Sequence, residues 1–261
     1  MITRNYGSVP LLHFNNLDSF SDVFHFVTTR RGGVSSGAWE SFNLGFNSGD
    51  DHQNVENNRK ILADAVGVNQ DCLIFQKQIH SDIVTVVDKP YHGSEICETD
   101  SMITNKPGLC LCVKGADCVP ILFFDPVGKA VGVAHAGWKG TVKKIAANVI
   151  EAMELLYSCK PSDIKVAVGP SIGPEVYEVG AEVIEKARES FGSQNPFIIR
   201  KNDKTYFDLW EANRSVLAEA GVLSKNIEIS GICNYSNDND FFSHRKSGGK
   251  TGRFAAGIMI K

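Results

Sequence analysis

Hydrophobic and polar positions along this chain follow two periods, and each period predicts one kind of element. Short apolar runs rich in Val, Ile and Phe, bounded by Gly, Pro or polar residues, are typical of buried strands. Such runs predict strands over residues 23–28, 109–113, 119–124, 130–134, 164–168, 227–232 and 253–260. Residues 73–87 also have strand character, interrupted between Gln78 and Ser81.

Apolar residues at helical spacing predict four helices. The segments are residues 55–66, 140–157, 181–191 and 209–220. Gly67 directly follows the first of them and is a natural C-cap. Strands and helices interleave without regular strand–helix–strand spacing, and no repeat or linker divides the chain. The pattern predicts an α+β fold, a single domain over residues 1–261 with mixed β-sheets flanked by helices.

Composition and charge exclude several classes of function. The 261 residues are 43% hydrophobic and carry 27 basic and 30 acidic side chains, a net charge of −3. Without a basic face or a charge run, neither a nucleic acid nor a membrane is an expected partner. No apolar run approaches the ~18 residues of a spanning helix, and the N-terminus lacks the apolar segment of a signal peptide. The seven cysteines form no CxxC pair, so we expect a cytoplasmic protein with reduced thiols and, by default, a monomer.

A metal or acid–base site would have to be assembled from distant segments. The chain has seven histidines, and none of them forms an HxH, HExxH or HxxxH pair. His80, Cys118 and His135 each lie at or near the end of a predicted strand, beside Gly or small residues. Two imidazoles and one thiolate suit Zn²⁺, and three protein ligands leave a fourth position for water. Spacing alone leaves two other interpretations open, a buried structural Cys with hydrogen-bonded histidines and a nucleophilic Cys118 paired with a histidine.

Several short motifs occur in order along the chain and together give a family resemblance. They are Gln78-Ile79-His80-Ser81, Thr99-Asp100-Ser101-Met102-Ile103-Thr104, Gly115-Ala116-Asp117-Cys118-Val119-Pro120, His135-Ala136-Gly137-Trp138-Lys139-Gly140-Thr141, Gly169-Pro170-Ser171-Ile172 and Ser243-His244-Arg245. With these motifs the chain resembles the YfiH-like laccase-domain family, also called polyphenol oxidoreductase or peptidoglycan editing factor, over nearly its whole length. The resemblance implies a YfiH-like fold and a Zn²⁺ site in which His80, Cys118 and His135 are both the ligands and the catalytic residues.

The resemblance also implies a function. It indicates a purine nucleoside enzyme that performs phosphorolysis of adenosine, inosine and methylthioadenosine and deaminates adenosine, so that purine nucleosides and phosphate are its partners. A multicopper laccase is not expected, because a trinuclear copper cluster and a blue copper site need closely paired histidines that this chain lacks. Two alternatives stay open: a cysteine-type amidase that edits mis-incorporated residues in peptidoglycan precursors with Cys118 as nucleophile, and a metabolite-binding module without catalysis.

Cationic residues are the candidates for binding phosphate. They are Arg30, Arg31, Arg59, Lys139 and Arg245. The run Arg30-Arg31-Gly32-Gly33 offers charge together with open backbone amides, and a solvated turn explains it equally well.

Other polar residues are candidates for contacts to the ribose or the base. Asn43 and Asp51 belong to a polar, glycine-rich segment, residues 35–51, and turn formation is an equal interpretation for both. Gln78 lies two residues before the ligand His80. The family motif at His244 and Arg245 indicates a loop that closes the pocket. Asp117, by contrast, is expected to hold its own loop through hydrogen bonds to backbone amides.

Overall fold

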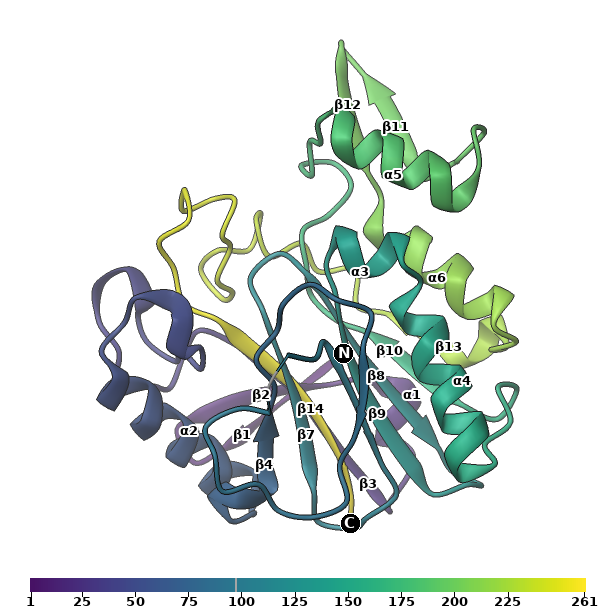
Figure 1. The fold of residues 1–261 in the computed structure, drawn as a ribbon. Helices are drawn as coiled ribbons and strands as arrows, with labels where there is room; N and C mark the ends of the chain where they lie inside the picture. Colours follow the sequence, from purple (N-terminus) through teal and green to yellow (C-terminus); the bar gives the residue numbers. More distant parts are fainter. Residues whose placement is uncertain (97) are drawn as a thin grey trace.

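Two six-stranded β-sheets pack face to face, and helices cover their outer surfaces (Figure 1). This computed structural model describes residues 1–96 and 98–261. Across the molecule the layers are α2 (His52–Val66), the first sheet, the second sheet, and the pair α4 (Ile145–Tyr157) and α6 (Leu209–Glu219). The predicted α+β class, with mixed sheets flanked by helices, is confirmed.

The first sheet has the order β1-β2-β3-β14-β7-β4 and is antiparallel except between β4 and β7. Its strands are β1 (Ile2–Tyr6), β2 (Val9–His13), β3 (Val23–Thr28), β14 (Phe254–Ile260), β7 (Cys110–Gly115) and β4 (Leu73–Phe75). The last strand of the chain therefore lies in the middle of this sheet, between β3 and β7.

The second sheet has the order β13-β10-β8-β9-β6-β5 and is parallel only at its two edges. Its strands are β13 (Ile227–Ile229), β10 (Lys165–Val168), β8 (Val119–Asp125), β9 (Ala130–Ala136), β6 (Ser101–Thr104) and β5 (Val84–Val86). Both sheets are therefore mixed, and β8 and β9 form the central hairpin of this one.

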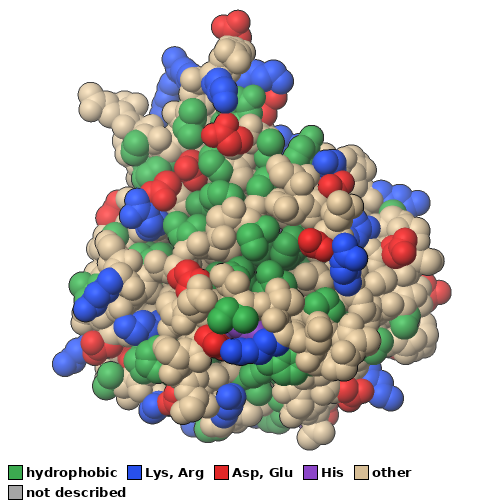
Figure 2. Space-filling view, turned by 180° about the vertical axis from the view of Figure 1, so that it is seen from behind, with side chains coloured by type: hydrophobic (Ala, Val, Ile, Leu, Met, Phe, Trp, Pro, Cys, Tyr) green, Lys and Arg blue, Asp and Glu red, His purple; other side chains and the backbone are tan. Residues whose placement is uncertain are grey.

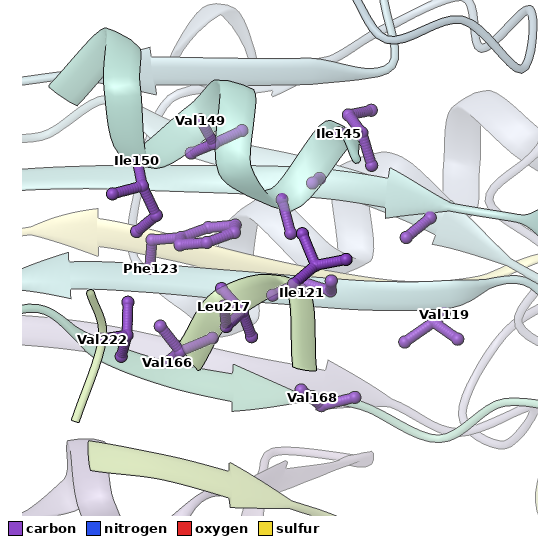
Figure 3. Close-up of a cluster of buried hydrophobic side chains, with 14 of the residues drawn as sticks. Val119, Ile121, Phe123, Ile145, Val149, Ile150, Val166, Val168, Leu217 and Val222 are labelled. Atoms are coloured by element: carbon purple, nitrogen blue, oxygen red, sulfur yellow. The ribbon is translucent and has the colours of Figure 1, made fainter. Parts of the chain in front are cut away.

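The central strands are apolar on both faces because both faces are covered. Ile121 and Phe123 of β8 belong to the cluster beneath α4 and α6, which Figure 3 shows around Val149 and Leu217. The intervening side chain of Leu122 points into the second cluster, between the two sheets. Strands buried on both faces become continuous hydrophobic runs, which is why the sequence pattern of β8 was clear.

The predicted helix over residues 140–157 is wrong as a single element. It consists of α3 (Trp138–Val142) and α4, separated by Lys144, whose φ of 59° is left-handed. A left-handed residue interrupts the helical hydrogen-bond ladder and changes the direction of the chain. The other helix boundaries hold more closely: α2 begins at His52 after the N-cap Asp51, and Gly67 is its left-handed C-cap, as predicted.

Two hairpins lie outside the predicted elements. One is β1–β2 at the N-terminus, and the other is β11 (Ile198–Lys201) with β12 (Lys204–Phe207). The second hairpin and α5 (Ala181–Phe191) project from the layered body (Figure 1). The bounds of α5 agree with the predicted helix. Both missed hairpins contain solvent-exposed strands, β1 and β11, that have no apolar face for a sequence pattern to reveal.

Charged side chains of both signs are interspersed over the face shown in Figure 2. This mixture agrees with the net charge of −3. Among the described residues, no helix combines the length and the apolar content needed to cross a bilayer.

Candidate metal centre and its pocket

Three residues that are distant in sequence meet at the open end of the β8–β9 hairpin in the second sheet. His80 lies in the segment between β4 and β5, Cys118 directly precedes β8, and His135 lies near the end of β9. Their ligand atoms all lie within 4.8 Å of one another. Cys118 Sγ is 3.9 Å from His80 Nε2, and the two imidazole rings are edge-on, with centroids 4.9 Å apart. The structure thus brings together the set that the sequence predicted.

Strand pairing explains this convergence. Val119 pairs with Ala136, so Cys118 and Gly137 face each other at the end of the β8–β9 hairpin. A Cβ on Gly137 would lie 2.8 Å from Cys118 Sγ and 3.2 Å from His80 Cδ2. Any larger residue would push into the ligand set, and the glycine in this motif therefore keeps space for it.

The donor set fits a zinc ion. Tetrahedral zinc with bonds of about 2.0–2.3 Å places its N and S ligands roughly 3.5 Å apart. Cys118 Sγ and His80 Nε2 are 3.9 Å apart, and all three ligand atoms lie within 4.8 Å of one another, so small side-chain rotations can close the set around an ion. Two imidazoles with one thiolate, and three ligands rather than four, are the chemistry of an open zinc site.

Asp100 organises both histidines. Its Oδ1 accepts a hydrogen bond from Nδ1 of His135, at 2.8 Å, and another from the backbone amide of His80, at 3.0 Å. Its Oδ2 accepts from the amides of Ile79 and Ser81 and from the Ser81 hydroxyl. His80 has a left-handed φ of 62°, which a non-glycine residue adopts only when its surroundings hold it there. Asp100 therefore fixes the segment that carries one ligand and the ring orientation of the other.

The same contacts determine the charges at the site. Burial opposes ionisation of Asp100, but hydrogen bonds from His135 and Ser81 hold the pKa of its carboxyl well below the usual range. Burial also raises the pKa of the Cys118 thiol, but the charges and hydrogen bonds of His135 and His80 outweigh it and lower this pKa to about 6. Burial lowers the pKa of His135, while Cys118 and Asp100 raise it to about 9. With His135 Nδ1 bonded to a carboxylate, Nε2 is the nitrogen left for a ligand.

His80, Cys118 and His135 line a cavity of about 390 Å³. Its other lining residues fall into two groups. One group is Gly45, Asn47, Gln78, Glu95, Lys114 and Arg253, and the other is Ala116, Asp117, Tyr177, His244 and Arg245. A cavity of this size suits a small organic ligand, and its lining combines apolar surface with several charged and polar side chains.

Three of the predicted substrate contacts line this cavity. Gln78 bridges to the backbone of Lys114, donating to its carbonyl and accepting from its amide at 2.9 and 2.8 Å. Arg245 lies over the Tyr177 ring, 5.3 Å from the centroid, and His244 is its neighbour in the lining.

Asp117, which was expected to hold its own loop, instead holds the loop that carries His244 and Arg245. That carboxylate accepts hydrogen bonds from the Ser243 hydroxyl, at 2.7 Å, and from the backbone amide of Arg245, at 2.6 Å.

The structure places the predicted phosphate cradle outside the cavity lining. Arg30 donates to the carbonyls of Glu40 and Asp238, and Arg31 pairs with Asp240 at 2.9 Å. These contacts hold the two guanidinium groups against the loops where they lie. The role of Arg30 and Arg31 in binding substrate stays a prediction.

Four further candidates also lie outside the lining. Asn43 is buried and ties its own loop together through Ser48, Asp50 and Gly45, and Asp51 caps α2. Both thus have the turn-forming role that was the equal interpretation.

The remaining two candidates are cations. Arg59 is buried, with its guanidinium donating twice to the carbonyl of Leu44 and once to Ser94 and Glu95. Lys139 is exposed and lies 5.5 Å from the centre of the Trp138 ring. Their contacts to substrate, like those of Asn43 and Asp51, stay predictions.

Sequence reasoning missed several lining residues. They are Asn47, Glu95, Lys114, Tyr177 and Arg253. A signal existed for one of them, because Lys114 is the only charged side chain in the otherwise apolar run that forms β7. A charged residue in a fully buried strand needs a partner, and that partner is often part of a site.

A family model, two named relatives and a solved structure each match most of this chain. The family model described as multi-copper polyphenol oxidoreductase laccase matches residues 24–261. A protein of Bacteroides thetaiotaomicron named purine nucleoside phosphorylase is 36% identical over 259 residues, covering 96% of each chain. A protein of an unknown prokaryotic organism named adenosine deaminase is 36% identical over 93% of this chain and 96% of its own. The crystal structure of the Bacillus licheniformis hypothetical protein YfiH aligns with a TM-score of 0.90 at 34% identity, covering 99% of both chains.

Proposed function

The chain belongs to the multi-copper polyphenol oxidoreductase laccase family, to which YfiH-like proteins are assigned, and from this premise we propose that it is a zinc-dependent purine nucleoside enzyme. As a purine nucleoside phosphorylase it cleaves adenosine, inosine and methylthioadenosine with phosphate, and as a deaminase it converts adenosine to inosine. The names of its relatives support both activities.

One observation carries the proposal, the meeting of two imidazoles and one thiolate at the wall of a ligand-sized cavity. His80, Cys118 and His135 would hold the ion. Asp100 would orient the two histidine ligands through its hydrogen bonds to His135 and to the His80 amide. A bound zinc supplies Lewis acidity, which polarises an oxygen or nitrogen of the substrate and lowers the pKa of water. That chemistry suits a purine, whose deamination exchanges the 6-amino group for a water oxygen with release of ammonia.

Phosphorolysis places separate demands on the pocket. An oxygen of phosphate bonds to the anomeric carbon, and the bond from that carbon to the purine breaks with its electron pair leaving on the base. The base then takes up a proton, so hydrogen-bond donors near it stabilise the transition state. Burial raises the pKa of Tyr177 well above its usual value, so this phenol keeps its proton and can donate to the purine. The Arg245 guanidinium beside it adds a permanent positive charge.

Zinc is preferred over the copper of the family description. Among the described residues, one group of three His, Cys or acidic side chains is arranged to hold a metal. A multicopper oxidase needs a trinuclear cluster and a separate blue copper site, which require many more histidines. We further propose that the chain acts as a monomeric, cytoplasmic single domain.

A second candidate function rests on the lowered pKa of Cys118. A thiolate beside an imidazole is also the arrangement of a nucleophilic cysteine, which would suit an amidase acting on peptidoglycan precursors. The two functions differ in their response to reagents. Iodoacetamide would block the amidase through a covalent adduct that added zinc does not reverse, whereas a chelator would block the nucleoside enzyme and zinc would restore it.

Chromatography of adenosine incubated with the purified protein tests the proposal. We expect adenine that depends on added phosphate, inosine that does not, and neither product with Cys118→Ala. Adenosine returned unchanged by protein with confirmed bound zinc would contradict the nucleoside function and favour the amidase.

A further inference from the structure

The pocket wall contains a cluster of buried charges that the metal centre does not use. Glu95 Oε1 accepts hydrogen bonds from Arg59, at 2.6 Å, and from Lys114. All three side chains are no more than 10% exposed, and the Arg59 guanidinium is stacked between Phe46 and Phe75. One carboxylate thus faces two cations, so the cluster carries an excess positive charge.

Arg253 is a third cation beside this cluster. Lys114 of β7 pairs with Ala255 of β14, so Arg253, two residues before Ala255, is a diagonal neighbour on the same face of the sheet. Both cations line the cavity. Through Nη1 the Arg253 guanidinium donates to the carbonyls of Thr251 and Gly252. No described residue accepts from its Nε or Nη2, so these donors are available to a ligand.

Lys114 also keeps a donor for the cavity. Its ammonium group donates to Glu95 and to the carbonyl of Gln76, which leaves one N–H. Burial and the charges of Arg59 and Arg253 lower its pKa to about 8, although Glu95 opposes them. Cations that are removed from water without full compensation are costly, and an anion between them offsets that cost.

We propose that Lys114 and Arg253 form the subsite that binds inorganic phosphate, with the amide of Asn47 as a further donor. The assignment rests on the proposed function and adds the residues for its second substrate. The cluster of Arg59 and Glu95 keeps Lys114 in place, and Gly45 fits against the stem of Arg253, where a Cβ would lie 2.7 Å from Cγ. Tyr177, His244 and Arg245 are then left for the nucleoside.

The test measures how the zinc-loaded enzyme depends on phosphate concentration during cleavage of inosine. Arg253→Met keeps the methylene stem and removes the charge, and we expect it to raise KM for phosphate by about 10- to 100-fold, the loss of a charge-assisted hydrogen bond. KM for inosine should change by less than about 2-fold, a split that a merely structural role would not produce. Arg253→Lys should recover part of the loss. Arg200→Met, at an exposed arginine of β11, is the matched control.

Calorimetric titration with inorganic phosphate alone tests the subsite without turnover. Wild type should bind phosphate, whereas Arg253→Met and Lys114→Met should bind it at least 10-fold more weakly. Inosine 5′-monophosphate, titrated without phosphate, distinguishes the phosphate of a nucleotide from the free anion. Weaker binding of this nucleotide than of inorganic phosphate supports the proposal, and tighter binding of the nucleotide than of inorganic phosphate overturns it.

The remaining outcomes separate this inference from the proposed function. Unchanged KM for phosphate and unchanged phosphate affinity in Arg253→Met overturn the subsite while the nucleoside function stands. Phosphate bound at Lys114 and Arg253 without cleavage of any purine nucleoside overturns the proposed function and leaves an oxyanion site.

Discussion

Two pairs of histidines in this molecule have nearly the same geometry and opposite chemistry. His13 and His25, on β2 and β3, meet edge-on with ring centroids 5.2 Å apart. His80 and His135 meet edge-on at 4.9 Å. Ring geometry alone would therefore give both pairs the same role.

Their neighbours separate them. His25 Nε2 accepts a hydrogen bond from the Phe14 amide, and His13 Nε2 lies 3.3 Å from the Tyr6 hydroxyl. Burial is the main cause that lowers the pKa of both, that of His25 to about 3, and the charge of Asp18, which is paired with Arg4, does not outweigh it. His135 instead has Cys118 and Asp100, and its pKa is raised. The His13–His25 pair is buried and has neutral partners, whereas the His80–His135 pair, of which His80 is exposed, has anionic partners.

The largest expected difference between the pairs is the effect of removing a ligand. Cys118→Ala should lower zinc affinity by more than the 10- to 100-fold that loss of a supporting partner costs, and should abolish turnover. His25→Gln should leave one zinc per chain. Metal analysis of the purified variants measures both, with Cys72→Ala as a control cysteine. A full complement of zinc in Cys118→Ala would show that the reactive pair is not a metal site.

A smaller effect is expected at the carboxylate that supports the reactive pair. Asp100→Asn keeps the shape of the side chain but loses the charge that His135 and the His80 segment rely on. We expect zinc affinity to fall by about 10- to 100-fold, measured by competition with a chelator.

The surface pair of Asp71 and His92 offers a matched control. Its Oδ2 to Nδ1 distance is 2.9 Å, but both side chains are more than half exposed. Asp71→Asn should not change zinc affinity. Equal losses in the two variants would mean that Asp100 has no special role.

The His13–His25 pair should make the free energy of unfolding depend on pH. His25 stays neutral in the folded protein down to a pKa of about 3, whereas the unfolded chain binds this proton below about 6.5. Its contribution to stability is therefore present above pH 6.5 and is lost as the pH falls toward 3. Between pH 7 and pH 5 we expect the free energy of unfolding to fall by about 2 kcal/mol from this group.

Urea unfolding of wild type and His25→Gln at both pH values measures that loss. Glutamine keeps an acceptor for the Phe14 amide and cannot be protonated, so the variant should lose less stability on acidification. An equal loss of unfolding free energy between pH 7 and pH 5 in the two proteins would refute the assignment of His25 as a buried neutral group.

The smallest effect is expected at Tyr6. Tyr6→Phe removes only the hydroxyl that contacts His13 and retains the edge-on packing of the ring against Phe24. A loss of about 0.5–1 kcal/mol in unfolding free energy, without change in zinc content, should follow. Altered zinc content would contradict the expectation that the two histidine pairs are independent of each other.

Much of the layered core could be predicted from the sequence, because its strands are covered on both faces. The bounds of β3 and α5 agree with the predicted ones, and β8 differs by one residue. The β1 strand was missed because four of its five residues are exposed and carry no apolar pattern. The break at Lys144 was missed because no Gly or Pro marks it.

The site could be predicted in part. Cys118 and His135 were identified from their places at strand ends, and these two together with His80, Gln78, His244 and Arg245 through the family resemblance. Lys114 and Arg253 were missed because they are more than a hundred residues apart and become neighbours only through the pairing of β7 with β14. Arg30 and Arg31 attracted attention as a charged turn, whereas the Asp238 carbonyl and the Asp240 carboxylate that bind them lie about two hundred residues later in the chain.

We propose that the His80–His135 pair, and not the His13–His25 pair, belongs to a zinc site for purine nucleoside phosphorolysis. Phosphorus NMR of inosine mixed with inorganic phosphate and zinc-loaded protein follows that reaction. We expect the phosphate signal to convert to that of ribose 1-phosphate as hypoxanthine forms, with wild type and His25→Gln but not with Cys118→Ala. No ester signal from the zinc-loaded wild type, or an undiminished signal from Cys118→Ala, would contradict it.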